Sequence, residues 1–195
     1  MMIAYVLPAL AYLLGSVSTG VVVARLFGLQ DPRATGSKNP GATNLLRYGG
    51  KLAAVLTLTG DILKGVVAIL VARAFTDDAA ILALAGLAVF VGHLWPVFFG
   101  FHGGKGVATA LGVWLALNPW VGLLLIVTWL AVAVLSRYSS LSALAAAVAA
   151  PLYVYLLMPQ PAYFAMMVVM SALLIFRHRV NIRRLLAGTE TKIGR

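Results

Sequence analysis

The sequence predicts an all-α polytopic integral membrane protein with seven transmembrane helices. Hydrophobic residues fill 62% of its 195 positions and charged residues only 10%, whereas a soluble domain carries about 25% charged residues. The apolar residues form long continuous runs, which is the pattern of membrane-spanning helices. The net charge of +10 comes mostly from loops beside these runs, so we assign it to positive-inside topology and expect no nucleic-acid partner.

The first of the seven candidate spans is the N-terminal run. It could be taken for a signal peptide, but it lacks a positive n-region and its apolar character continues to Phe27, so we interpret it as a retained span. The seven segments are 2–27, a part of 52–75, 79–99, 107–117, 120–135, 141–158 and 162–176. We find no internal repeat and interpret residues 1–195 as one domain with a short basic cytoplasmic tail at 177–195.

The second span has two possible registers, which differ in where Asp61 and Lys64 lie. A helix that starts at Leu52 places both charges near the middle of the membrane, about 14–18 Å along the helix. A bend at Gly60, with 45–59 lying along the interface, starts the span at Asp61 and places both charges at the cytoplasmic edge. The two residues can pair in either register, because they are i,i+3 neighbours. We favour the second register, since it buries no charge at the midplane.

The third segment, 79–99, is long enough to span, but the fourth, 107–117, covers only about 16 Å, half of a bilayer core. The fourth could be fused with the fifth into one helix kinked at Asn118-Pro119, which would give six spans. Seven spans place thirteen of the fifteen cations on one side, with the N-terminus outside and the C-terminus in the cytoplasm, as the positive-inside rule favours. A short fourth helix implies that the glycine-rich stretch before it dips into the membrane, surrounded by protein or a water-filled cavity.

This topology brings three polar clusters to the cytoplasmic face, and the first is GSKNPGATN at 36–44, followed by Arg47. Its glycines let successive backbone N–H groups converge on an anion, its short polar side chains add donors, and Arg47 offers a bidentate fork. An ordinary surface loop is the alternative, since loops are made of the same residue types.

The second cluster is GHLWPVFFGFHGGKGVAT at 92–109. It is not a Walker A loop, because Phe99 stands where the first glycine belongs and Gly106 where Ser or Thr belongs. GGKG before a helix start nevertheless combines flexible N–H groups with one lysine charge, as an anion cradle does. His93 and His102 could share a metal, but neither has a Cys partner and carboxylates are few, so we expect no metal and favour a hydrogen-bonded structural role for His93.

The third cluster is the tail, RHRVNIRRLLAGTETKIG, at 177–194. A juxtamembrane anchor for acidic lipid headgroups accounts for part of its charge, but Asn181 and Glu190 are not needed for that role. His178 and Asn181 share one face of a helix at i,i+3.

Together the clusters predict a site for a phosphorylated, amphipathic substrate. The chain has no cysteine, no G-x-S-x-G elbow, no HExxH and no histidine with an aspartate five residues on, and these absences exclude the reaction types that depend on such motifs. Five acidic residues offer little material for a catalytic carboxylate pair. We therefore expect a reaction that relies on positioning and charge stabilisation of an already activated substrate.

Five motifs in consistent order resemble the bacterial membrane acyl-phosphate:glycerol-3-phosphate acyltransferase family: DPRATGSKNPGATNLLR, GDILKG, GHLWPVFFGFHGGKGVAT, RYSSL and RHRVNIRRLLAGTE. The resemblance extends from about Gly15 to Lys192. It implies transfer of a fatty acyl group from acyl phosphate to the 1-hydroxyl of glycerol 3-phosphate, giving lysophosphatidic acid and phosphate without a covalent enzyme intermediate. It also implies no cofactor, a cytoplasm-facing site in the bacterial inner membrane, and membrane lipids and the soluble enzyme that makes acyl phosphate as partners.

By motif, the resemblance implies roles for residues of every cluster. The catalytic candidates are Ser37, Arg47, Lys105, His178, Asn181 and Glu190. The candidates that bind substrate or phosphate are Gly36, Asn39, Gly41, Thr43, Asn44, Gly103, Gly104, Gly106 and Ser140. Asp61, Lys64 and His93 are expected to have a structural role next to these residues and not to contact the substrates directly. Lys38 and His102 depart from the family pattern, where glycine and lysine respectively are common.

Two other functions fit part of the sequence. A transporter of a phosphorylated metabolite would also need cationic anion sites, but it should show paired broken helices in related halves and polar residues that reach the far side. A scaffold that recruits soluble lipid enzymes through its basic tail leaves both glycine loops unexplained. We therefore favour the acyltransferase.

Overall fold

The computed structural model describes residues 2–194, which form helices and no strand. The predicted all-helical class is confirmed; Arg195, the last residue of the predicted tail, lies outside the described residues, as does Met1. The helices are α1 (Met2–Gly15), α2 (Thr19–Leu26), α3 (Ala42–Tyr48), α4 (Gly50–Arg73), α5 (Ala79–Leu94), η1 (Val97–Phe99, a 3-10 turn), α6 (Val107–Leu117), α7 (Pro119–Ser136), α8 (Ser139–Leu157), α9 (Pro161–Arg177) and α10 (Arg179–Leu186).

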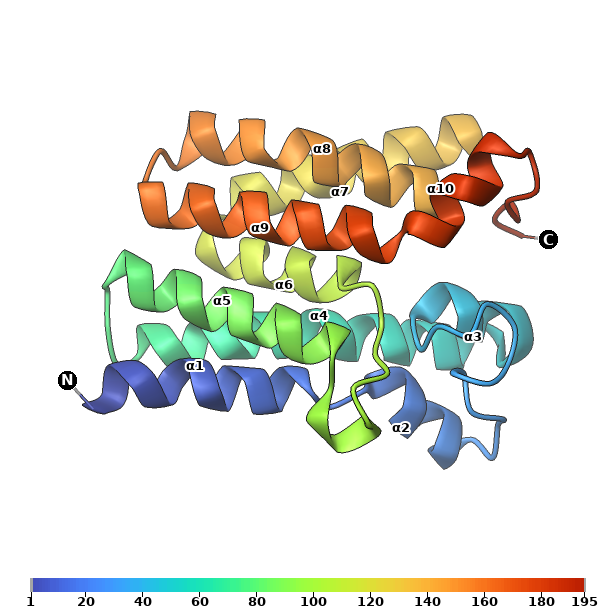
Figure 1. Ribbon diagram of the computed structural model, residues 1–195, viewed down its shortest axis with the longest axis horizontal. Helices are drawn as coiled ribbons and strands as arrows, with labels where there is room; N and C mark the ends of the chain where they lie inside the picture. Colours follow the sequence, from blue (N-terminus) through green and yellow to red (C-terminus); the bar gives the residue numbers. More distant parts are fainter. Residues whose placement is uncertain (1, 195) are drawn as a thin grey trace.

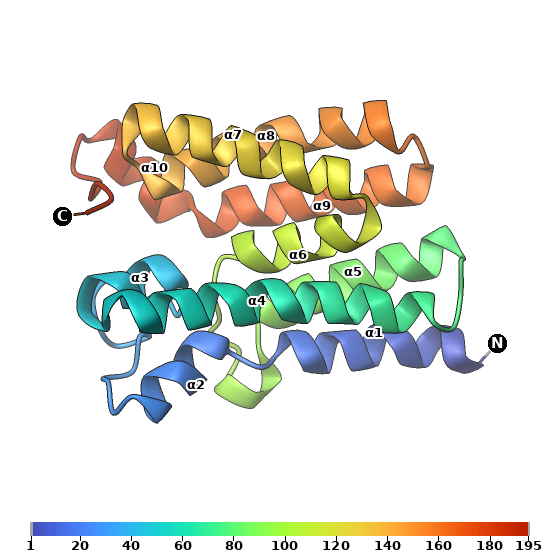
Figure 2. The same ribbon diagram turned by 180° about the vertical axis from the view of Figure 1, so that it is seen from behind.

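The long helices lie in two layers with the short helix α6 between them (Figure 1). Helices α1, α4 and α5 form one layer, and α7, α8 and α9 form the other, as the reverse view also shows (Figure 2). Helix α6 packs on α4 and α7, while α5 contacts α9 directly. The core between the layers contains Phe90, Trp114 and Met170, each at most 2% exposed.

Four helical segments are long and apolar enough to cross a membrane: Gly50–Arg73, Ala79–Phe99, Pro119–Ser136 and Ser139–Leu157. Two bent pairs bring the number to six if each is one span, and α6 is a shorter apolar helix. One pair, α1 with α2, replaces the single first span that the sequence predicts, because the chain turns by 40° after Gly15. The other pair, α9 with α10, is bent by 57°.

The predicted start of the second span at Asp61 is wrong. Helix α4 runs without a break through Gly60, and the bend lies before it, where Gly50 has a φ of +87°. Gly60 and Gly65 serve close packing instead: a Cβ at Gly60 would collide with Thr19, and one at Gly65 with the backbone of α6. Asp61 and Lys64 therefore lie along the length of α4, where the protein buries them.

The short fourth segment is a helix of its own, as the seven-span reading requires. Asn118 separates it from α7, and its side-chain oxygen accepts from the backbone N–H groups of Trp120 (3.0 Å) and Val121 (3.3 Å). Arg73 donates to the last carbonyls of α6, those of Ala116 (2.6 Å) and Leu117 (2.9 Å). Both helix ends thus find partners inside the protein, which a helix terminus away from water requires.

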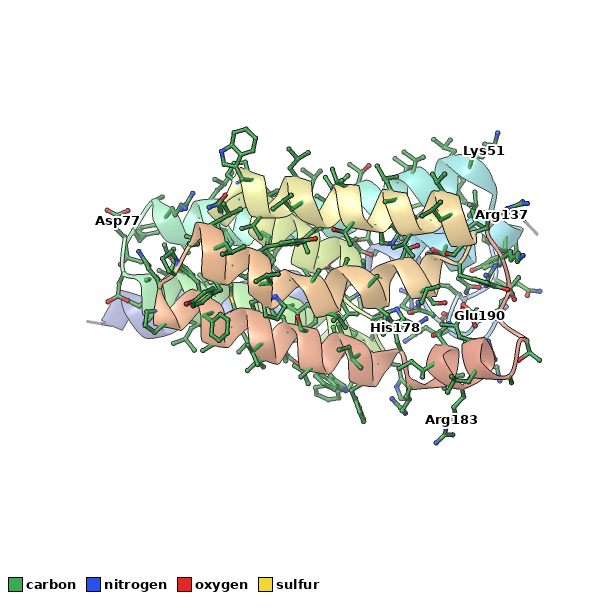
Figure 3. All side chains as sticks on the ribbon, turned by 90° about the horizontal axis from the view of Figure 1, so that it is seen from above. Lys51, Asp77, Arg137, His178, Arg183 and Glu190 are labelled. Atoms are coloured by element: carbon green, nitrogen blue, oxygen red, sulfur yellow. The ribbon has the colours of Figure 1, made fainter. Side chains whose placement is uncertain are left out.

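Charged side chains gather toward one end of the bundle. Figure 3 shows Asp77 at one end and, toward the other, Lys51, Arg137, His178, Arg183 and Glu190. The loop before α3, the loop before α6 and the tail all lie toward this second end (Figure 1).

Candidate active site

A cavity of about 390 Å³ opens where the three predicted clusters meet. Helices α3 to α10 all contribute to its wall. The predicted site residues that line it are Ser37, Asn39, Gly41, Thr43, Asn44, Arg47, Asp61, His93, Lys105, Gly106, Ser140, His178, Asn181 and Glu190. Gly36, Lys64, Gly103 and Gly104 lie behind this wall and touch the residues that form it.

Asn44 holds the first loop in shape. Its side-chain oxygen accepts from the backbone N–H of Ser37 (2.9 Å), and its amide nitrogen donates to the carbonyls of Pro32 (3.1 Å) and Thr35 (2.9 Å). Gly36 has a φ of +61°, and a Cβ there would collide with the Asn44 side chain. The loop is therefore built around a buried amide, which leaves Ser37 and Asn39 to face the cavity.

Lys38 has a φ of +56°, in the left-handed region that glycine adopts without strain. Its neighbours in the loop form two turns, with Lys38 N–H donating to Thr35 O at 3.1 Å. This backbone conformation gives a physical reason for glycine at this position in the family pattern.

A chain of hydrogen bonds joins the GGKG loop to the tail and to α8. Lys105 Nζ donates to Asn181 Oδ1 (2.6 Å), and Asn181 Nδ2 donates to Glu190 Oε1 (2.7 Å). Ser140, in the first turn of α8, donates its hydroxyl to the same Glu190 oxygen (2.6 Å). The tail is held in place for this contact, because Ile193 N–H donates to the Arg137 carbonyl at the α7–α8 turn (2.7 Å).

Arg177 fixes the backbone of the GGKG loop. Its guanidinium donates to the carbonyls of Gly103 (Nη2, 2.8 Å) and Gly104 (Nε, 3.1 Å). Sequence reasoning missed this residue, because it assigned the tail's cations to lipid headgroups. Its position in the sequence could have indicated a role in the site, since Arg177 directly precedes the candidate residue His178.

The loop needs its glycines for space. A Cβ at Gly103 would collide with the His93 carbonyl, and a Cβ at Gly104 with the His93 imidazole. Gly106, with a φ of +89°, turns the chain into α6, and a Cβ there would strike Phe90. The loop therefore lies directly against α5.

Burial lowers the pKa of Lys105 to about 8, with Glu190 opposing the shift and Arg47, Arg184 and Arg177 adding to it. The ammonium consequently lies in a site where cations outnumber carboxylates. A bound phosphate would relieve this repulsion, which is a property of an anion site. Arg184 also lines the cavity, and the sequence did not single it out.

His178 is 2% exposed, and its Nδ1 lies 2.8 Å from the Leu174 carbonyl. Because a carbonyl can only accept, Nδ1 carries the proton of this bond. The neutral ring then leaves Nε2 as an acceptor in the cavity wall. His102, by contrast, is exposed and bonds only the Gly100 carbonyl (2.6 Å).

Away from the polar end, the cavity is apolar. One face of α8 lines it with Ala143, Ala146, Ala147 and Ala150. Large side chains from α6, α7 and α9 also line it, including Trp114, Ile126, Trp129 and Met167. Small residues on one wall thus leave room for a long apolar group that continues from the cationic end.

Comparison with known proteins gives one consistent answer. A family model described as glycerol-3-phosphate acyltransferase matches residues 5–188. The glycerol-3-phosphate acyltransferase of Thioalkalivibrio sulfidiphilus is 58% identical and that of Methylococcus capsulatus 55% identical; each alignment covers 100% of this chain, and 96% and 98% of the relative respectively.

Solved structures agree with these relatives. The crystal structure of PlsY (YgiH), an integral membrane glycerol 3-phosphate acyltransferase, in its glycerol 3-phosphate form, superposes with a TM-score of 0.93 and 45% identity, over 98% of this chain and 96% of that one. The lysophosphatidic acid form of PlsY gives a TM-score of 0.91 and 44% identity, over 98% and 95%.

Proposed function

Because the chain belongs to the glycerol-3-phosphate acyltransferase family, we propose that it transfers a fatty acyl group from acyl phosphate to the 1-hydroxyl of glycerol 3-phosphate. The products are lysophosphatidic acid and phosphate. The glycerol 3-phosphate and lysophosphatidic acid forms of PlsY support this acceptor and this product. The observation that carries the proposal is that one cavity joins a cationic end to an apolar one.

The cationic end has groups for two phosphates. The first loop offers Ser37 and Asn39, and α3, which follows it, offers Arg47. The GGKG loop offers Lys105 with the N-terminus of α6. Arg47 is suited to a bidentate contact with phosphate, while Lys105 supplies a point charge. A donor and an acceptor that each carry phosphate match this pair of anion-binding groups.

The apolar end fits a fatty acyl chain. From Ser140 to Ala150 the cavity follows α8 for about 15 Å at 1.5 Å per residue. A hydrocarbon with C–C bonds of about 1.52 Å at angles of about 111° advances about 1.25 Å per carbon. The cavity therefore accommodates about twelve carbons beyond the polar end, by the same geometry.

The reaction needs no covalent enzyme intermediate. The acceptor hydroxyl oxygen attacks the acyl carbon, the bond from that carbon to the phosphate oxygen breaks, and the hydroxyl proton ends on the released phosphate. His178 Nε2 accepts a hydrogen bond from the hydroxyl and orients it, while Lys105 offsets the charge that grows on the leaving phosphate. Asn181, Glu190 and Ser140 hold Lys105 in place through the hydrogen bonds described above.

The same proposal places the enzyme in the bacterial inner membrane, with the cavity facing the cytoplasm. Counting α6 with the four long spans and the two bent pairs gives seven spans, which places the basic loops and the tail on one side. Membrane lipids surround the exposed apolar faces, such as the Leu123, Val127 and Val134 side of α7. The soluble enzyme that makes acyl phosphate would deliver its product to this face.

Purified protein in lipid vesicles tests the proposal directly. Glycerol 3-phosphate is supplied with palmitoyl phosphate or with palmitoyl-CoA, and lysophosphatidic acid is measured by mass spectrometry. We expect product only from palmitoyl phosphate. Product from palmitoyl-CoA at the same rate would overturn the donor assignment, and no product from either would overturn the activity.

A further inference from the structure

Three buried polar side chains form a line from the α1–α2 break to the GGKG loop. Asp61 and His93 also line the cavity, and Lys64 lies behind them. Lys64 Nζ lies 2.9 Å from Asp61 Oδ1 and donates to the carbonyl of Val17, between α1 and α2, at 2.9 Å. The side chains of Asp61 and Lys64 are both 4% exposed. Neither takes part in the hydrogen-bond chain from Lys105 to Ser140.

His93 continues this line to the loop. Its Nδ1 lies 3.4 Å from Asp61 Oδ1, and the Nε2 edge of the ring abuts Gly104 so closely that a Cβ there would collide with it. The His93 carbonyl also accepts from the Gly104 N–H at 3.1 Å. The imidazole is thus wedged between a fixed carboxylate and the residue that precedes Lys105.

Stability alone gives a weak reason for this arrangement. Removing two charges from water is costly, and replacing a buried ion pair by apolar residues of similar volume is often neutral or stabilising. Such a pair can instead fix a direction, because the same carboxylate oxygen, Asp61 Oδ1, contacts both the lysine and the imidazole. A ring with a fixed direction gives the loop a fixed wall, and Arg177 holds the same loop through its Gly103 and Gly104 carbonyls.

We propose that Asp61 is a positioning residue: held by Lys64, it fixes the His93 ring, and the ring sets the place of Gly104 and therefore of Lys105. This proposal rests on the proposed function, in that the loop it positions belongs to the same cavity. It also assigns a role to the α1–α2 break, whose free carbonyl at Val17 anchors the lysine end of the line.

The first test removes both charges together, so that neither is left alone in the interior. In Asp61→Leu/Lys64→Met we expect kcat/KM to fall about tenfold to 100-fold, since a misplacement of about 1 Å can cost about 100-fold. A second readout does not depend on turnover: the rate at which an amine-specific reagent modifies Lys105, followed by mass spectrometry. We expect this rate to rise several-fold, because Lys105 loses its fixed contact with Asn181.

Thr128→Val is the matched control. It removes a polar link between α7 and α8, the Thr128–Tyr153 hydrogen bond of 2.7 Å, without touching the cavity. We expect unchanged Lys105 reactivity and unchanged kcat/KM in this variant, even where its melting temperature falls. A rise in Lys105 reactivity in the control equal to that in the double variant would assign the effect to general loosening and overturn the proposal.

If the double variant does not fold, His93→Leu tests the proposal instead, because this variant leaves Asp61 paired with Lys64. We expect it to raise Lys105 reactivity and lower kcat/KM, and His93→Gln, which keeps a donor toward Asp61, to recover part of both. Wild-type reactivity and kcat/KM in folded His93→Leu or in the folded double variant would overturn the proposal. Absence of wild-type turnover would count against the proposed function alone, since Lys105 reactivity still reports on the positioning.

Discussion

Lys105 and Asn181 lie 76 residues apart in the sequence, yet Lys105 Nζ donates to Asn181 Oδ1 at 2.6 Å. This bond joins the loop before α6 to α10 across the cavity. It places the ammonium at the polar end, where two glycine-rich loops and the tail meet.

Replacing Lys105 removes the charge that offsets the leaving phosphate. We expect Lys105→Ala to lower kcat by about 100-fold to 1000-fold, the range for loss of one transition-state donor. The variant should fold normally, because removing a buried ammonium leaves no unpaired charge in its place. Initial rates with palmitoyl phosphate, together with a thermal melt, check both statements; an active, folded Lys105→Ala would remove this loop from the mechanism.

The activity should fall as the pH rises through about 8. Burial lowers the pKa of Lys105 to about 8, so the ammonium loses its proton there and not near 10.5. The charged groups that act on it are Glu190, Arg47, Arg184 and Arg177. Lys105→Arg keeps its charge over this range, so we expect its pH profile of kcat/KM to lack the decline. If kcat/KM of Lys105→Arg declined at the same pH as that of the wild type, the titrating group would be another residue.

Arg177 should control how well the loop binds phosphate. Its two hydrogen bonds to Gly103 and Gly104 need a planar fork, which lysine does not have. We expect Arg177→Met to raise the KM for a phosphate-bearing substrate by about tenfold, the loss expected for two hydrogen bonds from one side chain, and Arg177→Lys to recover only part. Arg179→Met is the control, because Arg179 lies two residues further along the chain with an exposed side chain. This variant should leave the KM unchanged.

Chain-length preference should depend on the alanine face of α8. We expect Ala150→Phe to fill the far end of the cavity and shift preference from palmitoyl toward decanoyl phosphate by about tenfold, the order of effect for several displaced methylenes. Val148→Phe, at a site 69% exposed on the opposite face, should leave the preference unchanged. Competition between the two donors in one vesicle sample measures the ratio.

Much of the architecture could be predicted from residue pattern. The break at Asn118-Pro119 and the bounds 107–117 match α6, because an amide before proline caps one helix and ends another. The meeting of the three clusters also follows from pattern, since charge asymmetry places their loops at one end of the bundle. Seven spans and their orientation stay a prediction.

The remainder depended on tertiary contacts that a pattern does not contain. In the sequence, Gly60 indicates a bend, but in the structure it leaves space for the Thr19 side chain. A glycine that bends a helix and one that allows close packing look the same in the sequence, and only the packing partner distinguishes them. In the sequence, Asn44 is one of several short polar residues in its loop, and nothing distinguishes it from them. In the structure its side chain makes the hydrogen bonds that hold the loop in shape. Arg177 looks like any juxtamembrane cation until the loop carbonyls beside it are known.

The hydrogen-bond chain that ends at Glu190 has a consequence for biosynthesis. Its donors and acceptors come from the loop before α6, from α8, from α10 and from the segment after α10, so the cavity wall is complete only after residue 190 has left the ribosome. Earlier helices can insert into the bilayer while the chain is still being made, but they hold no assembled site. A nascent chain in the membrane should therefore not act on lipid precursors until translation has passed Glu190.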